Sequence, residues 1–233
     1  MGALAQLSDA SGLELEAYGA AHVERGVRRA VAREPIGDER GLAELLQADP
    51  AARVRFRRSI AVSVSGLFRD PAQFELLEHE LLPLLIAGGR PIAAWSAGCA
   101  DGSELVSLGL LLDRLGALDG SSLLGSDVLA ENLELARGYA LDEAIPESLH
   151  RCLCWERRDL VREEPPPGQW TLVLCRNLAI YLARDAKEQL HSKLARALVA
   201  GGILLLGRSE RVSEPGKLGL KRIAPHAYLK VSA

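Results

Sequence analysis

The sequence is poor in aromatic residues and has no long apolar run. Only 4% of its 233 residues are aromatic (three Trp, four Tyr and three Phe), so Leu, Ala, Val and Ile must fill most of the core. No run approaches the roughly 20 apolar residues that span a bilayer. The start of the chain lacks the basic segment and apolar stretch of a secretory signal. We therefore expect a cytoplasmic protein that does not insert into membranes.

The chain also lacks an excess of positive charge and any cysteine pattern typical of metal sites. A formal net charge of -3 at pH 7 argues against a general nucleic-acid binder, because that class needs a clearly basic surface. The four cysteines form no Cys-x-x-Cys pair and have no nearby histidine at metal-ligand spacing: Cys99, Cys152, Cys154 and Cys175. This pattern predicts reduced, buried thiols and no metal site.

The first 60 residues are expected to form a small all-helical domain. Apolar periodicity predicts helices over 13–33, with Ser11 as N-cap, over 40–48 and over 50–59. These segments carry two arginine clusters, made of Arg25, Arg28, Arg29, Arg33, Arg53, Arg55, Arg57 and Arg58. The clusters fit an acidic partner helix, or they are solvated faces with internal pairs such as Glu24–Arg28. The sequence leaves both interpretations open.

The remainder of the chain alternates between short apolar runs and amphipathic segments. Strands are predicted over 91–97, 123–127, 152–156, 170–175, 202–206, 219–223 and 227–231. Helices are predicted over 103–116, 129–138, 185–199 and, with Asp70 as N-cap, 71–87. This alternation predicts an α/β fold with a doubly wound, mostly parallel sheet. The last two strands are too close for a helical crossover and should form an antiparallel terminal hairpin. The expected domains are 1–60 and 61–233.

Three predicted strands end in segments that suit ligand binding, because ligands of open α/β sheets bind beyond the carboxyl ends of the strands. Small residues follow the first strand over 96–104, where a cofactor could approach the backbone. Asp127 ends the second strand, where a carboxylate can accept both hydroxyls of a ribose. Polar and aromatic groups follow the fourth strand over 176–181. A tight turn without ligand and a helix-capping Asp127 remain the alternative interpretations.

Several motifs then occur in the order found in one family. They lie at 65–71, 95–99, 125–127, 136–139, 175–181, 201–202 and 209–210. The most specific is Cys-Arg-Asn-Leu-Ala-Ile-Tyr over 175–181. From about residue 60 to its end, the chain resembles the CheR-type methyltransferases, which methylate glutamates of chemotaxis receptors with S-adenosylmethionine. The resemblance implies a class I methyltransferase-like fold for the second domain.

The resemblance also implies residue roles. Arg69 and Tyr181 would be catalytic, facing the transferring methyl and the substrate carboxylate. The implied cofactor-binding residues are Ser65, Arg69, Gly98, Glu104, Asp127, Asp159, Leu160 and Asn177. Among these, Asp127 would hold the ribose, the Asp159–Leu160 pair would flank the adenine, and Asn177 would lie near the amino-acid end. A salt-bridged Arg69 and a core Tyr181 with a solvated hydroxyl are the structural alternatives.

The chain departs from the family pattern at three places. Residues 102–107 read Gly-Ser-Glu-Leu-Val-Ser, where the family usually has Gly-Glu-Glu-Pro-Tyr-Ser. Asp159 replaces an asparagine. About a dozen residues separate Tyr139 from Cys152, which leaves little room for the β insert that tethers a receptor tail in some members. The expected partner is therefore an acidic helical segment of a chemoreceptor or signalling protein, without tail tethering. An inactive cofactor-binding or interaction module and a small-molecule O-methyltransferase are the alternatives.

Overall fold

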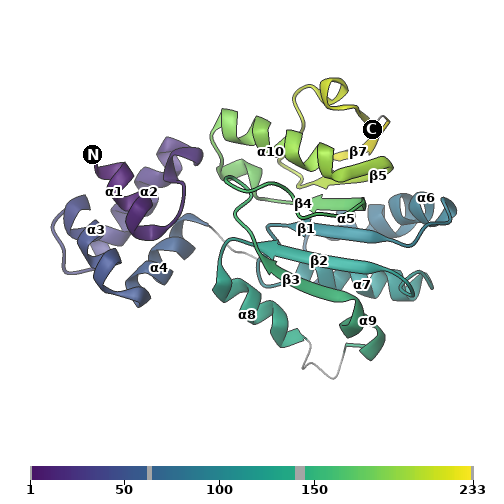
Figure 1. The fold of residues 1–233 in the computed structure, drawn as a ribbon, viewed down its shortest axis with the longest axis horizontal. Coiled ribbons are helices and arrows are strands. Elements are labelled where there is room, and N and C mark those ends of the chain that lie inside the picture. The colour runs from purple at the N-terminus through teal and green to yellow at the C-terminus, as the bar shows by residue number, and fades with distance from the viewer. Residues whose placement is uncertain (1, 62–64, 140–144, 232–233) are drawn as a thin grey trace. The chain divides into compact units, whose positions relative to one another are not determined.

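The computed structural model (Figure 1) describes residues 2–61, 65–139 and 145–231. The chain forms two compact units, Met1–Ser63 with Tyr181–Gln189, and Val64–Ile180 with Leu190–Ala233. The boundary expected after residue 60 stays a prediction, and the structure groups the segment from Tyr181 with the helical unit. Within the described ranges, every helix is too short or too polar to cross a membrane.

The first unit is built from short helices around a small leucine-rich core. Its elements are α1 (Ala3–Ser11), η1 (Leu15–Ala17), α2 (Ala20–Arg33), α3 (Glu39–Ala48) and α4 (Pro50–Ile60). The fully buried side chains of this unit include Leu7, Leu13, Leu15, Leu42, Leu46, Phe56 and Ile60. The helices predicted over 40–48 and 50–59 are confirmed as α3 and α4.

The helix predicted over 13–33 is wrong in its first part. Ser11 does not begin a helix but ends α1, and Gly12 follows in the left-handed conformation at φ +72°. The Gly12 N–H donates to the Ser8 carbonyl, which closes the last turn of α1. The chain then forms η1 and enters α2 only at Ala20. The Ser11-Gly12 pair therefore marks the C-terminal end of one helix and not the start of the next.

The second unit contains a seven-stranded sheet in the order β3-β2-β1-β4-β5-β7-β6. The strands are β1 (Ala93–Ala97), β2 (Ser122–Asp127), β3 (Leu153–Arg157), β4 (Trp170–Cys175), β5 (Leu198–Leu206), β6 (Leu220–Ala224) and β7 (Ala227–Lys230). β1 to β5 pair in parallel, whereas β7 is antiparallel to both β5 and β6. The predicted α/β class, the mostly parallel sheet and the antiparallel terminal hairpin are confirmed.

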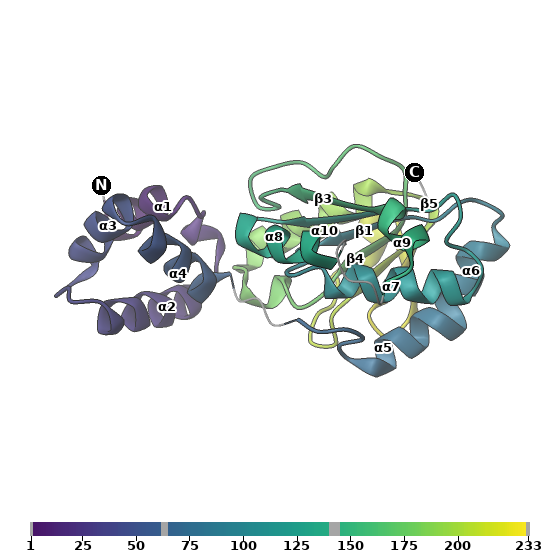
Figure 2. The ribbon, with the colours of Figure 1, turned by 90° about the horizontal axis from the view of Figure 1, so that it is seen from below.

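Helices cover the sheet and enclose its main core. They are α5 (Pro71–Leu76), α6 (Leu82–Ala87), α7 (Ser103–Arg114), α8 (Ala130–Gly138), α9 (Glu147–Cys152) and α10 (Arg184–Ala197). Buried side chains of α5, α7 and α9 pack in one apolar cluster with strand residues such as Leu172 and Leu174. The ribbons of these helices lie beside the sheet in Figure 2. Val173, equally buried, faces the other side, because side chains alternate along a strand. The central strand β4 is therefore buried on both faces, whereas the edge strand β3 is partly exposed.

The predicted helix over 71–87 contains an interruption. A π-helical segment, Leu77–Leu81, separates α5 from α6 and directly precedes Leu82-Pro83. Pro83 has no N–H to donate to the preceding turn, which accounts for the widened geometry. Asp70 was expected to be the N-cap, but it has φ +60° and makes no side-chain capping bond. Its carboxylate instead accepts a hydrogen bond from Arg176.

Two further boundaries differ from the prediction. Cys152 ends α9, a helix that the sequence did not predict, so Cys152 and Cys154 do not share one strand face. β5 begins at Leu198 rather than at 202, because the chain re-enters the sheet through a register shift opposite Trp170. Between α8 and β3, the described residues contain the helix α9. The lack of a tethering β insert stays a prediction.

Gly125 provides a test of packing in the sheet. A Cβ at this position of β2 would lie 2.4 Å from Cζ3 of Trp155. We expect Gly125→Ala to lower the free energy of unfolding by about 1–3 kcal/mol in urea titrations, because a rigid ring must move. Gly138→Ala, whose Cβ would meet no atom within 4 Å, is the control and should cause no loss. Equal losses in both variants would contradict this account.

Candidate cofactor and active site

The carboxyl ends of β1, β2 and β4 meet at one edge of the sheet. In the parallel register, Ala97 pairs with Ser126, and Ser96 pairs with Leu174. The loops that begin at Gly98 and after Asp127 and Cys175 therefore leave the sheet side by side. The structure thus brings together the three segments that the sequence singled out.

The loop after β1 has a backbone path that needs glycine. Gly98 has φ +79°, and its N–H and that of Cys99 both donate to the Ser126 carbonyl at 2.9 Å. A Cβ on Gly98 would lie 3.1 Å from the Leu178 side chain. Gly102, at φ +87°, leaves even less room, since its Cβ would be 2.6 Å from the Trp155 ring. The loop is therefore held close to the ends of β2 and β4.

Asp127 is a nearly buried carboxylate, 8% exposed, that already organises two loops. Its Oδ2 accepts from the Ala100 N–H at 3.0 Å. Its Oδ1 accepts from the Leu129 N–H at 2.8 Å and from Asn132 Nδ2 at 3.1 Å. Burial raises the pKa of Asp127, and these hydrogen bonds oppose that rise. The helix-capping alternative is wrong, because the N-cap residue of α8 is Leu129. Asp127 instead stabilises the turn before that helix, and a carboxylate has further lone pairs for a ribose.

Arg176 forms the most connected buried site in the second unit, and its side chain is only 2% exposed. Nε donates to Gln73 Oε1 at 2.8 Å, and Nη1 donates to Glu104 Oε2 at 3.0 Å. Nη2 donates to the Asp70 carboxylate at 3.1 Å and to the Arg69 carbonyl at 2.6 Å. One guanidinium therefore joins the end of β4 to the start of α5 and to the start of α7.

Sequence reasoning did not assign Arg176 this organising role. The sequence feature that could have indicated this role is the Cys-Arg-Asn motif, in which an arginine directly follows a strand that is buried on both faces. Both oxygens of the Glu104 carboxylate have a partner, because Oε2 accepts from Arg176 and Oε1 accepts from Ser96 Oγ at 2.7 Å. The Arg176 guanidinium also lies 5.1 Å from the centre of the Phe74 ring. That Glu104 lines a cofactor pocket stays a prediction.

The segment before α5 is held in an unusual conformation. Phe68 and Asp70 have φ values of +53° and +60°, which few non-glycine residues adopt. The Phe68 N–H donates to Ser107 Oγ at 2.9 Å, so α7 supports this turn from one side. Arg69, which lies between the two, is half-buried. Strained segments of this kind are found at functional sites, where surrounding structure maintains them. Ser65, at the start of the same segment, is exposed.

Asp159 and Leu160 follow β3 in a turn that stabilises itself. Asp159 Oδ1 accepts from the Val161 N–H at 3.0 Å, while the Asp159 N–H donates to Glu163 Oε1 at 3.0 Å. Leu160 is buried, and its carbonyl accepts from Lys193 Nζ at 3.2 Å. The Asp159 carboxylate therefore stabilises its own turn. Contact of this pair with an adenine stays a prediction.

Asn177 and Tyr181 belong to different units. Asn177 has φ +60°, and its N–H donates to Glu210 Oε2 at 2.7 Å. Tyr181 is grouped with the helical unit, where its ring lies 4.9 Å from that of His22 and its carbonyl accepts from the Gly19 N–H. The pairing of Tyr181 with Arg69 at a reactive centre stays a prediction.

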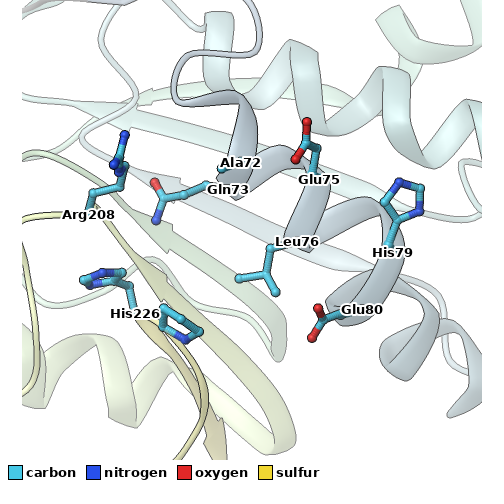
Figure 3. A pocket seen from close by; sticks show the side chains of 9 residues that line it. Ala72, Gln73, Glu75, Leu76, His79, Glu80, Arg208 and His226 are labelled. Carbon is cyan, nitrogen blue, oxygen red and sulfur yellow. The ribbon is translucent and has the colours of Figure 1, made fainter.

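The second unit also has a pocket of about 460 Å³. Figure 3 shows Arg208 and His226 on one side of it and Glu75, His79 and Glu80 on the helical side. Gln73, which binds Arg176, forms part of the same wall. None of the predicted site residues lines this pocket, so it is distinct from the predicted cofactor site.

The sheet order, the glycine-containing loop after β1 and the carboxylate at the end of β2 are typical of cofactor-binding α/β domains. The match to a family model identifies this domain as an S-adenosylmethionine-dependent methyltransferase with a class I fold. The family described as CheR methyltransferase, SAM binding domain, matches residues 63–151 and 139–224. The chain therefore belongs to the CheR methyltransferase family, as the sequence motifs predicted.

Similar proteins carry corresponding names. A chemotaxis protein methyltransferase of Listeria monocytogenes is 25% identical over 94% of this chain and 92% of its own length. Chemotaxis protein methyltransferase 1 of Vibrio cholerae is 28% identical over 74% of this chain and 75% of its own length. Among solved structures, a TehB-like SAM-dependent methyltransferase from Corynebacterium glutamicum is 17% identical, with a TM-score of 0.42, over 69% of this chain and 97% of that one.

Arg176 gives the site a direct energetic test. Arg176→Met would leave the half-buried Glu104 and Asp70 carboxylates without their shared cation. We expect it to lower the free energy of unfolding by about 3–5 kcal/mol in urea titrations. Adding Glu104→Gln should recover part of this loss, because one stranded charge is removed. A loss below about 1 kcal/mol in the single variant would show that the network is not structural.

Proposed function

We propose that the chain transfers a methyl group from S-adenosylmethionine to glutamate carboxylates of a chemoreceptor or a related signalling protein. The observation that carries the proposal is the Arg176 network. It fixes the strained Arg69 segment against the loops after β1 and β4, where the family's cofactor and reactive groups are expected. The names of the similar chemotaxis methyltransferases support the same substrate class.

The residues at the carboxyl edge fit this cofactor. Asp127 offers a buried carboxylate at the end of β2, where ribose hydroxyls are bound in related α/β folds. Because Gly98 has no side chain, a cofactor can approach the backbone closely after β1. We propose that Asn177 holds the amino-acid end and that Asp159 and Leu160 flank the adenine. Ser65 and Glu104 complete the proposed set.

The proposed reaction requires little general acid–base catalysis by the protein. When bound, S-adenosylmethionine supplies an electrophilic methyl on a sulfonium. A glutamate side chain, with a reference pKa of about 4.3, is ionised at neutral pH and needs no general base. The task of Arg69 is then to orient the substrate carboxylate, and a catalytic role for Tyr181 stays a prediction. The methyl ester is neutral, so the modification removes one negative charge from the partner.

The helical unit offers a basic surface for such a partner. Arg25, Arg28, Arg29 and Arg33 are exposed on α2, although Arg28 also pairs with Glu24. The second arginine cluster is largely used internally. Arg55 pairs with Glu34, and Arg53 donates to carbonyls at the end of α3. Both sequence interpretations therefore apply in part, and we propose that α2 binds an acidic helical segment without tail tethering.

The altered segment over 102–107 supports an enzyme rather than an inactive module. Leu105 and Val106, which replace the family's Pro-Tyr, are fully buried in the core under α7. Ser103 is also buried, and its hydroxyl bonds to Asp101 and to the Tyr139 hydroxyl. These substitutions therefore fill core positions and do not line an open site. A small-molecule methyltransferase is the weaker candidate, because it needs no basic helical surface.

The cofactor assignment is tested by calorimetry with S-adenosylhomocysteine. We expect the wild-type chain to bind it and Asp127→Ala to bind about tenfold more weakly or worse, because ribose hydroxyls lose their acceptor. Asp113→Ala, which removes an exposed carboxylate on α7, is the control and should bind normally. Absence of wild-type binding at high micromolar concentration would refute the assignment, and unchanged binding by Asp127→Ala would refute its role.

The role of Arg69 is tested by separating turnover from binding. Arg69→Ala should lower tritiated methyl transfer to chemoreceptor-containing membranes by about a hundredfold, since a carboxylate-orienting cation is lost. Its affinity for S-adenosylhomocysteine should change only a fewfold. Arg90→Ala, on an exposed loop before β1, serves as the control. Equal losses in turnover and binding would indicate a purely structural arginine.

A further inference from the structure

A further buried charged side chain, Glu210, lies behind the loop that follows β4. Glu210 is 4% exposed, and its carboxylate accepts three backbone N–H groups. Oε2 accepts from Asn177 at 2.7 Å and from Gly207 at 2.8 Å. Oε1 accepts from Ile180 at 3.2 Å. One carboxylate therefore joins the loop after β4 to the turn after β5.

The chemistry of this contact requires a carboxylate. An ionised carboxylate only accepts, and its two oxygens can serve all three N–H donors. A glutamine would turn an amide group toward at least one of these donors. Asn177 also has φ +60°, so its backbone keeps this conformation only where the surroundings support it. Glu210 provides that support from the side of β5.

The Glu210 carboxylate is packed tightly against the backbone of Gly207 and Asn177. A Cβ on Gly207 would lie 2.6 Å from Glu210 Oε2 and 2.8 Å from the Asn177 nitrogen. The Glu210 N–H donates to the Gly207 carbonyl at 2.9 Å, and the Glu210 carbonyl lies 2.7 Å from His226 Nδ1. The turn that carries the carboxylate is thus fixed at both ends.

We infer that Glu210 is a positioning residue that sets the place of Asn177 and thereby the affinity for the cofactor. Neither the family motif nor the proposed cofactor set gives Glu210 this role. The inference rests on the proposed function, because it takes Asn177 to contact the amino-acid end of S-adenosylmethionine. Glu210 itself acts through the backbone of the loop and does not touch the cofactor.

The test compares variants that disturb this contact with variants that only lower stability. Calorimetry with S-adenosylhomocysteine and thermal unfolding are measured for wild type, Glu210→Gln and Gly207→Ala. Leu118→Ala removes a buried side chain in the loop before β2, at the opposite edge of the sheet, and controls for stability. Gly216→Ala, whose Cβ would meet no atom within 4 Å, controls for the glycine substitution.

We expect Glu210→Gln and Gly207→Ala each to weaken binding by about tenfold, because the Asn177 N–H loses its acceptor or is displaced. Leu118→Ala should keep its affinity within about twofold, even where its melting temperature falls as far as that of Glu210→Gln. If Glu210→Gln does not fold, Gly207→Ala carries the test against Gly216→Ala.

Two results would overturn the inference alone. One is wild-type-like affinity in both Glu210→Gln and Gly207→Ala. The other is a loss of affinity in Leu118→Ala equal to theirs at the same melting temperature, which would reduce Glu210 to a stability effect. Failure of the wild-type chain to bind would instead refute the proposed function itself, so the two failures are distinguishable.

Discussion

The site depends on the hydrogen bonds and ion pairs that the buried Arg176 guanidinium makes. Its planar set of donors binds two carboxylates, a side-chain amide and a backbone carbonyl from segments far apart in the sequence. A lysine ammonium could not reproduce this fixed geometry. Burial of such a charge is costly unless it is paired and hydrogen-bonded, and the partners at the starts of α5 and α7 meet that condition. The edge of the sheet is thus held by charge compensation as well as by apolar packing.

The same edge concentrates backbone conformations that are unfavourable in isolation. Phe68, Asp70, Ala100 and Asn177 all have positive φ values. Each is restrained by a contact with another segment: Ser107 holds Phe68, Arg176 holds Asp70, and Asp127 holds Ala100. Glu210 does the same for Asn177. Pre-organised loops of this kind suit a reaction in which the protein mainly positions two reactants.

Much of this architecture could be predicted from the sequence, because hydrophobic runs and their spacing are local signals. The order of the seven strands and of most helices, the terminal hairpin and the Asp127 position follow from such signals, whereas α1 and α9 were missed. The π-helical segment and the start of α2 could not be placed, since Pro83 and Gly12 act through geometry that local periodicity does not encode. The roles of Arg176 and Glu210 were missed because their partners are distant along the chain. The grouping of Tyr181 with the helical unit likewise depends on tertiary contacts.

The central claim is that this edge directs methyl transfer to a glutamate carboxylate. The most direct measurement is alkali lability of the label, after incubation of the protein with labelled S-adenosylmethionine and chemoreceptor-containing membranes. Methyl esters of glutamate release labelled methanol in mild base, and mass spectrometry then locates the modified residues. The account predicts alkali-labile label on glutamates of receptor helices. Alkali-stable label, or no transfer by a chain that binds the cofactor, would contradict it.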